Sequence, residues 1–222
     1  SDATYNVRYV VEGSDGLSGG DSRVLFSTIE NRKATQTVYQ LKPKMSDMTD
    51  RGFYGYEFVN SQTQTFNVKS GVNNFDFVVR PIEYNITFAG VDSGWAAAHE
   101  KTYTVSDESF NIMGANDAPT MEGYEFVGWD YNSDTVGIKV GSAAHSAMNP
   151  VVETGSHADI QFTASWARLV GKDAEYVYDG NLKSFDGTAH VEGKNGQTIK
   201  GYKLAYYDED GKLLSGLPQY RD

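Results

Sequence analysis

The sequence predicts a mainly β protein made of tandem small modules with little helix. The pentapeptide Gly-Tyr-Glu-Phe-Val occurs twice, at 55–59 and at 123–127. Runs that alternate large apolar with polar side chains recur along the chain, which is the period-2 pattern of half-buried strands. With 15 Tyr, 11 Phe and 23 Gly among 222 residues, the composition also favours strands and turns.

The first two modules each open and close on an alternating run. The opening runs are Tyr5–Tyr9 and Tyr84–Phe88, and the closing runs are Phe75–Arg80 and Ile160–Trp166. Each pentapeptide copy lies between the opening and the closing run of its module. This shared order indicates two copies of one plan rather than one large domain.

The repeated order divides the chain into a first unit at 1–81, a second unit at 82–168 and a third unit at 169–222. Pro81 lies at the first boundary, where its inability to donate to a strand ladder suits a junction. The third unit is short, and its Asp210-Gly211 pair predicts a hairpin turn. We expect the third unit to be a partial β-sandwich-like or hairpin unit.

Two short helical turns are expected, one in each of the first two units. The first lies within 42–51, where Ser46 or Asp47 would cap it, and the second lies within 107–113. The stretch 92–97 is predicted to be a loop.

The second unit resembles the Listeria–Bacteroides repeat, also called the internalin B-repeat. The resemblance rests on Tyr84-Asn85-Ile86-Thr87-Phe88, Pro119, Gly123-Tyr124-Glu125-Phe126-Val127-Gly128-Trp129 and Phe162-Thr163-Ala164-Ser165-Trp166. It implies a small β-grasp-like fold that occurs in arrays on bacterial surface proteins. Between Gly137 and His157 the sequence departs from the family pattern, and an insertion is expected there.

The other two units are similar to further surface-protein repeats. The first unit resembles a mucin-binding-protein repeat through Tyr5–Val11, Gly55–Val59 and Phe75–Arg80. The third resembles bacterial Ig-like repeats through Tyr178-Asp179-Gly180 and Phe185-Asp186-Gly187-Thr188-Ala189-His190. These resemblances imply β modules of an extracellular protein.

Charge and cysteine content exclude several classes of function. The net charge of −11 argues against nucleic-acid binding, which needs a basic face. The absence of cysteine excludes disulfides, thiol catalysis and Cys-ligated zinc. No apolar run is long enough to span a membrane, so membrane insertion is not expected. The acidity is uneven, because the second unit holds 12 acidic and only 3 basic residues.

Motifs for catalysis are poor, and we expect no catalytic residue, metal or cofactor. Gly16-Leu17-Ser18-Gly19-Gly20 matches a nucleophile elbow, but a second strand rather than a helix is predicted to follow it. The four histidines, His99, His145, His157 and His190, show no metal-binding spacing. His99 and His145 are expected in exposed loops, and His190 is expected to make a structural hydrogen bond.

Aromatic side chains in loops are the best candidates for ligand binding, because sugars stack on their faces. The predicted ligand-binding residues are Trp95, Tyr131, Asp92 and Asp130. Packing at a module junction is the alternative role for Trp95. Loose calcium binding through Asp92, Asp130 or Asp134 is a further alternative, whereas Trp129 and Trp166 are predicted to belong to the core.

We therefore expect a non-catalytic stalk or adhesion region of a Gram-positive cell-surface protein, extracellular and cell-wall-associated. The expected partners are host mucin, glycans or extracellular glycoproteins, and the chain is expected to be monomeric. One alternative is a carbohydrate- or protein-binding module with its aromatic site in 82–168. A second alternative is an accessory region of a secreted enzyme.

Overall fold

The computed structural model of the chain describes residues 2–13, 23–141, 148–171, 183–184, 189–194, 205–207, 210–213 and 219–220. In the first unit the elements are β1 (Thr4–Val11), β2 (Val24–Lys33), β3 (Val38–Leu41), α1 (Met45–Thr49), β4 (Tyr56–Phe58), β5 (Gln64–Asn67) and β6 (Val72–Pro81). In the second they are β7 (Tyr84–Ala89), α2 (Ser93–His99), β8 (Lys101–Tyr103), β9 (Phe110–Asn111), β10 (Glu125–Tyr131), β11 (Val151–Val152) and β12 (Ile160–Gly171). Beyond them lie β13 (Lys183–Ser184), β14 (Ala189–Gly193) and β15 (Gln219–Tyr220). The predicted class, tandem β modules with little helix, is confirmed.

The first unit is built on a mixed four-stranded sheet in the order β2-β1-β6-β4. The two central strands, β1 and β6, run parallel, and both edge strands are antiparallel to their neighbours. Alternate residues of the central strands point to one face, as the period-2 pattern predicts. Those residues form the core, namely Tyr5, Val7, Tyr9, Phe75, Phe77 and Val79.

A second layer covers this core. The antiparallel ribbon of β3 and β5 adds Tyr39 and Phe66 to it, and α1 adds the fully buried Met48. The predicted helix within 42–51 is thus confirmed. Its predicted cap is wrong, because the residue before the helix is Lys44, which makes no side-chain cap. The Tyr9 hydroxyl instead accepts from the Lys44 amide at 3.1 Å and donates to the Asp47 carboxylate at 2.6 Å.

The second unit repeats the same strand order, because its sheet runs β10-β12-β7-β8. Again the first and last strands, β7 and β12, are parallel neighbours at the centre. Both units are therefore β-grasp-like, and β1, β2, β4 and β6 correspond to β7, β8, β10 and β12. The second core holds Ile86, Phe88, Trp129, Phe162 and Trp166, together with other apolar residues from 84–166.

The two pentapeptide copies occupy equivalent places in these sheets. Each forms or opens the edge strand that pairs with the last strand of its unit, β4 with β6 and β10 with β12. The tyrosine and phenylalanine of each copy pack on the core, whereas the glutamate between them is exposed. The repeated sequence therefore marks a repeated structural position.

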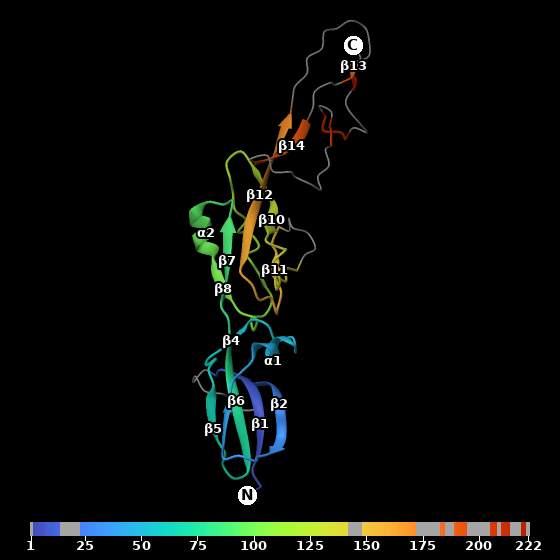
Figure 1. The fold of residues 1–222 in the computed structure, drawn as a ribbon. Coiled ribbons are helices and arrows are strands. Elements are labelled where there is room, and N and C mark those ends of the chain that lie inside the picture. The colour runs from blue at the N-terminus through green and yellow to red at the C-terminus, as the bar shows by residue number, and fades with distance from the viewer. Residues whose placement is uncertain are drawn as a thin grey trace.

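The strands of successive units follow one another almost directly (Figure 1). Only Ile82 and Glu83 separate the end of β6 from the start of β7. At the other end of the second unit, β12 continues past residue 168 to Gly171 and pairs there with β14. The expected division after residue 168 thus falls inside a strand.

Only parts of the third unit are described. β13 pairs with β15, and an isolated bridge joins Tyr207 to Leu213 around the predicted Asp210-Gly211 turn. The Tyr178-Asp179-Gly180 motif and the elbow-like stretch at 16–20 lie outside the described residues, as does His145.

The second helix lies elsewhere than predicted. Residues 107–113 contain bends and the short strand β9, whereas α2 occupies most of 92–97, the predicted loop. The expected insertion between Gly137 and His157 holds β11, which pairs with β9, and a bridge from Val140 to Val152.

The first two units contact each other through the glycine of the first pentapeptide. Gly55 has a φ of +81°, and its carbonyl accepts from the Ile82 amide at 2.9 Å. A Cβ placed on Gly55 would lie 2.2 Å from Cγ1 of Val105 and 3.0 Å from Cβ of His157, both in the second unit. The equivalent Gly123 has nearly the same φ, +79°, but nothing lies within 4 Å of its Cβ position.

This difference between equivalent glycines gives a matched test of the junction. Alanine at either position adopts a left-handed backbone, which costs about 1–2 kcal/mol. Gly55→Ala also forces a methyl group into Val105, so we expect a further loss of about 1–3 kcal/mol or a displacement of the junction. Urea denaturation and the amide chemical shifts of Val105 and His157 would measure both effects. Equal effects of Gly55→Ala and Gly123→Ala would contradict this packing.

Candidate functional site

Helix α2 determines the position of two predicted ligand-binding residues, Asp92 and Trp95. The Asp92 carboxylate accepts from the amides of Gly94 at 3.0 Å and Trp95 at 3.2 Å, which is N-cap geometry. This cap starts a helix where a loop was predicted. Asp92 is therefore engaged with the backbone of its own helix.

The Trp95 side chain packs against the core of its own unit, not at a module junction. Its ring centroid lies 5.1 Å from that of Phe88 and 5.4 Å from that of Trp129. The His99 ring stacks on the Trp95 ring, with centroids 3.6 Å apart. Trp95 Nε1 donates to the Asp117 carbonyl at 3.1 Å. The indole is thus partly buried, with one face covered by an imidazole.

His99 was predicted to lie in an exposed loop, but it lies in the last turn of α2. Its Nδ1 hydrogen bonds with the Trp95 carbonyl at 2.7 Å, and its Nε2 contacts the Asp117 carboxylate. Burial disfavours the imidazolium, but the hydrogen bonds to Asp117 and Trp95 and the Asp117 charge together raise the pKa of His99 above its ordinary value. His99, Trp95 and Asp117 therefore form one structural cluster.

The other two predicted ligand-binding residues lie on a different element, at the end of β10. Tyr131 is the last residue of that strand rather than part of a loop, and its ring lies 5.9 Å from that of Phe162. The Asp130 carboxylate accepts from the Tyr131 amide at 2.9 Å. The predicted site is thus divided between α2 and β10, and its two aromatic rings pack on the core.

The predicted core tryptophans are confirmed, since Trp129 is fully buried and Trp166 is 2% exposed. Among the described residues, no group of three or more His, Asp or Glu side chains is placed to hold a metal ion. His190 makes a hydrogen bond from Nε2 to the Glu192 carboxylate at 2.9 Å within β14.

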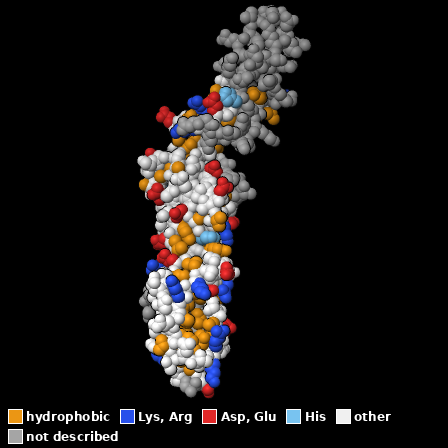
Figure 2. Space-filling view, viewed as in Figure 1, with side chains coloured by type: hydrophobic (Ala, Val, Ile, Leu, Met, Phe, Trp, Pro, Cys, Tyr) orange, Lys and Arg blue, Asp and Glu red, His pale blue; other side chains and the backbone are white. Residues whose placement is uncertain are grey.

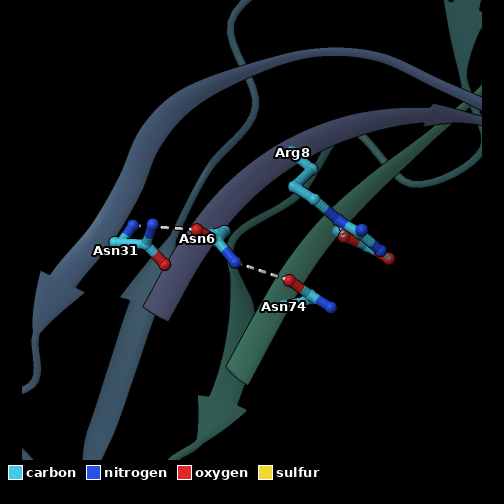
Figure 3. Close-up of polar contacts among 5 residues, drawn as sticks. Asn6, Arg8, Asn31 and Asn74 are labelled. Carbon is cyan, nitrogen blue, oxygen red and sulfur yellow. Dashed lines mark hydrogen bonds and ion pairs between the residues drawn. The ribbon is translucent and has the colours of Figure 1, made fainter. Parts of the chain in front are cut away.

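Polar side chains on the outer face of the first sheet form two cross-strand pairs between β1 and β6 (Figure 3). Asn6 Nδ2 donates to Asn74 Oδ1 at 2.8 Å. Arg8 donates to Asp76 twice, from Nε at 2.7 Å and from Nη2 at 2.9 Å. Both pairs join residues directly opposite in the parallel register. Each pair therefore connects the first and the last strand of the unit.

A hollow of about 380 Å³ lies beside these pairs, towards β2. Its walls include Asn6, Arg8, Ser27 and Asn31, and the Asn31 amide donates to Asn6 Oδ1 at 2.9 Å. Register shifts at three places in the β1–β2 pairing accompany the hollow. The Asn6 amide bonds Asn74 and Asn31, and the Arg8 guanidinium bonds Asp76, so these polar groups serve first to fix the strands.

A smaller cleft of about 190 Å³ lies at the junction of the first two units, and we call it the junction cleft. From the first unit it is lined by 52–54 and Tyr56, and from the second by Val105, Lys139, Gly155 and His157. The rings of Tyr54 and His157, which both line it, stack on each other, with centroids 5.2 Å apart and planes 9° from parallel. Tyr54 is 49% exposed.

Tyr54 was not among the predicted ligand-binding residues, although it directly precedes the first pentapeptide. The equivalent position before the second copy is Glu122. The signal for this residue is therefore the difference between the two copies, not their identity.

No protein-family model, curated protein or solved structure matches this chain. Within the described ranges, no helix combines the length and the apolar character needed to cross a bilayer.

The His99 cluster gives a pH-dependent prediction. Because its folded pKa is raised, protonated His99 stabilises the fold below its unfolded pKa of about 6.5, and this stability is lost as pH rises through the folded pKa. The gain is below about 1 kcal/mol, because Asp117 is half exposed and screened by solvent.

The measurement is the free energy of unfolding of the wild type and of Asp117→Asn over a pH series. We expect the wild type to be more stable than Asp117→Asn while His99 is protonated. This difference in the free energy of unfolding should shrink as the pH rises and His99 loses its proton. A difference that is constant with pH would rule out a charged His99–Asp117 pair.

Proposed function

We propose that this chain is a non-catalytic, load-bearing segment of a bacterial cell-surface protein. Its units would project an adhesive part of that protein, or contact host glycoprotein directly. The location we propose is extracellular and cell-wall-associated, on a Gram-positive bacterium, as the repeat resemblances imply. The observation that carries the proposal is the parallel pairing of the first and last strands in both units.

Parallel pairing of these strands determines how tension acts on each unit. The chain enters a unit at the start of its first strand and leaves it at the end of its last strand. Because the two strands point the same way, pulling on the ends slides one along the other and loads all their hydrogen bonds together. β1 and β6 share eight residue pairs, and β7 and β12 share four.

The cross-strand side chains of the first unit support the same function. Asn6–Asn74 and Arg8–Asp76 join the two strands that tension would slide apart. The Arg8 and Asp76 side chains are only 12% and 15% exposed, so their ion pair is less screened than a surface pair. These contacts resist a change of register.

The junction adds continuity between units. The link of Ile82 and Glu83 is too short for a flexible tether, and the contacts of Gly55 with Val105 and His157 reduce its freedom further. A segment of this kind suits a stalk, because each module folds on its own contacts and extends the reach of the whole.

The partners we propose for the parent protein are host mucin, other glycans or extracellular glycoproteins. An accessory region of a secreted enzyme is compatible with the same load-bearing geometry. A ligand site built on Trp95 and Tyr131 is disfavoured, because both rings pack on the core of the second unit.

Single-molecule force spectroscopy on the full chain tests the proposal with a matched pair of variants. Asp76→Asn removes the charge that holds β1 to β6, a loss of about 1–3 kcal/mol. Glu57→Gln removes the carboxylate that pairs with Arg80 at 2.7 Å, but between β6 and the edge strand β4.

Two unfolding events are expected from the first two units, and the second unit should unfold at the lower force because it has fewer parallel pairs. Asp76→Asn should lower the higher-force event, and Glu57→Gln should leave it unchanged. Equal responses to the two variants, or unfolding without resistance, would contradict a load-bearing role.

A further inference from the structure

We propose that the junction cleft binds a negatively charged sugar residue, one that carries a carboxylate or a sulfate group. Its aromatic wall would stack on the sugar ring, and Lys139 would bind the anionic group. This site specifies the direct contact with host glycans proposed above and rests on that part of the proposed function, but it does not depend on the load-bearing role.

The aromatic wall is the Tyr54 ring, which stands on His157. Tyr54 is half exposed, and stacking on the imidazole fixes the plane of its ring. His157 is held in turn, because its Nδ1 hydrogen bonds with the Gly155 carbonyl at 3.0 Å and its amide donates to Gly137 at 2.9 Å. A fixed, exposed aromatic face is what the apolar side of a sugar ring requires.

The glycines around His157 show how closely this wall is packed. A Cβ on Gly137 would lie 2.7 Å from the His157 ring, and a Cβ on Gly55 would lie 3.0 Å from its Cβ. Both glycines have positive φ. The imidazole beneath Tyr54 thus has little room to move.

Lys139 supplies the positive charge. Its Nζ lies 3.2 Å from the Cβ position of Gly155, so the ammonium group is over the floor of the cleft. Its backbone is fixed, since its amide donates to Ser156 Oγ at 3.1 Å and its carbonyl accepts from Glu153 at 2.9 Å. Lys139 thus lines the cleft from a fixed backbone position.

The ammonium group of Lys139 has no partner among the described residues, although the second unit is strongly acidic. The unit has three basic residues, and the other two are engaged. Lys101 lies 3.7 Å from the centre of the Phe110 ring, and Arg168 pairs with Glu192 at 3.2 Å. An unpaired cation beside an exposed aromatic ring favours an anionic ligand with an apolar face.

The size and the field of the cleft limit the ligand. A volume of about 190 Å³ is below the usual range of about 300–1,000 Å³ for small-molecule sites, so it limits the ligand to a single sugar residue that stays partly exposed. Acidic side chains are spread over the second unit in the view of Figure 2, so long-range attraction of an anion is weak. We therefore expect binding in the millimolar range, to which repeated units on a surface would add avidity.

The test is an NMR titration of the full chain that follows the amides of Tyr54, Gly155 and His157. The probes are 3′-sialyllactose for a carboxylate, 3′-sulfated lactose for a sulfate, and lactose as the neutral match. Saturable shifts with one or both anionic sugars, and none with lactose, are expected. The two anionic probes show which group the cleft prefers.

Matched variants test which residues bind the sugar. Lys139→Gln should weaken binding at least about tenfold, the usual effect of losing a charge-assisted hydrogen bond. Lys69→Gln is the control, because Lys69 is also exposed but lies at the turn before β6, away from the cleft. Tyr54→Ala should abolish binding, and Tyr54→Phe should retain it because the ring remains.

Three outcomes would overturn the proposal. Equal shifts with lactose, or unchanged affinity in Lys139→Gln, would show that the cleft does not select a charged sugar. No shift at these amides at tens of millimolar of any probe would show that it is not a sugar site. Force spectroscopy measures how strongly the paired strands resist unfolding, and it does not depend on binding in the cleft. Either proposal can therefore fail while the other stands.

Discussion

The parallel pairing of first and last strands is the constraint on which the rest of this structure depends. In both units it places the chain's entry and exit at opposite ends of the sheet, so that the units follow one another in a line (Figure 1). The chain between these strands must then supply both edge strands and the second layer over the core. The same pairing brings the inward side chains of distant segments together, such as Val7 opposite Phe75 and Phe88 opposite Phe162.

The strands and the repeat could be predicted from the sequence, because alternation and self-similarity are local signals. Their pairing could not, since the alternation in β1 is the same whichever strand lies beside it. Helix α2 was missed because it spans only 93–99, too short for a 3.6-residue period, and because its start depends on the Asp92 cap. That helix turns Trp95, a predicted ligand-binding residue, towards the core.

The two units differ most where they meet. The glycines of the two pentapeptides have the same backbone conformation, yet only Gly55 lies against a neighbouring unit. The residue before each glycine is Tyr54 in one copy and Glu122 in the other, and only the tyrosine stacks on a residue of the next unit. Identity between copies thus specifies the shared fold, and divergence between them specifies the junction and its cleft.

The strand pairing in each unit and the contacts of Gly55 imply two stiff units joined by a stiff junction, and residual dipolar couplings test this combination most directly. Backbone amide couplings from 23–81 and from 84–141 would be measured in one weakly aligned sample of the full chain. We expect a single alignment tensor to fit both sets. Two tensors of clearly different magnitude would show independent motion about Ile82 and Glu83 and would contradict a stiff junction.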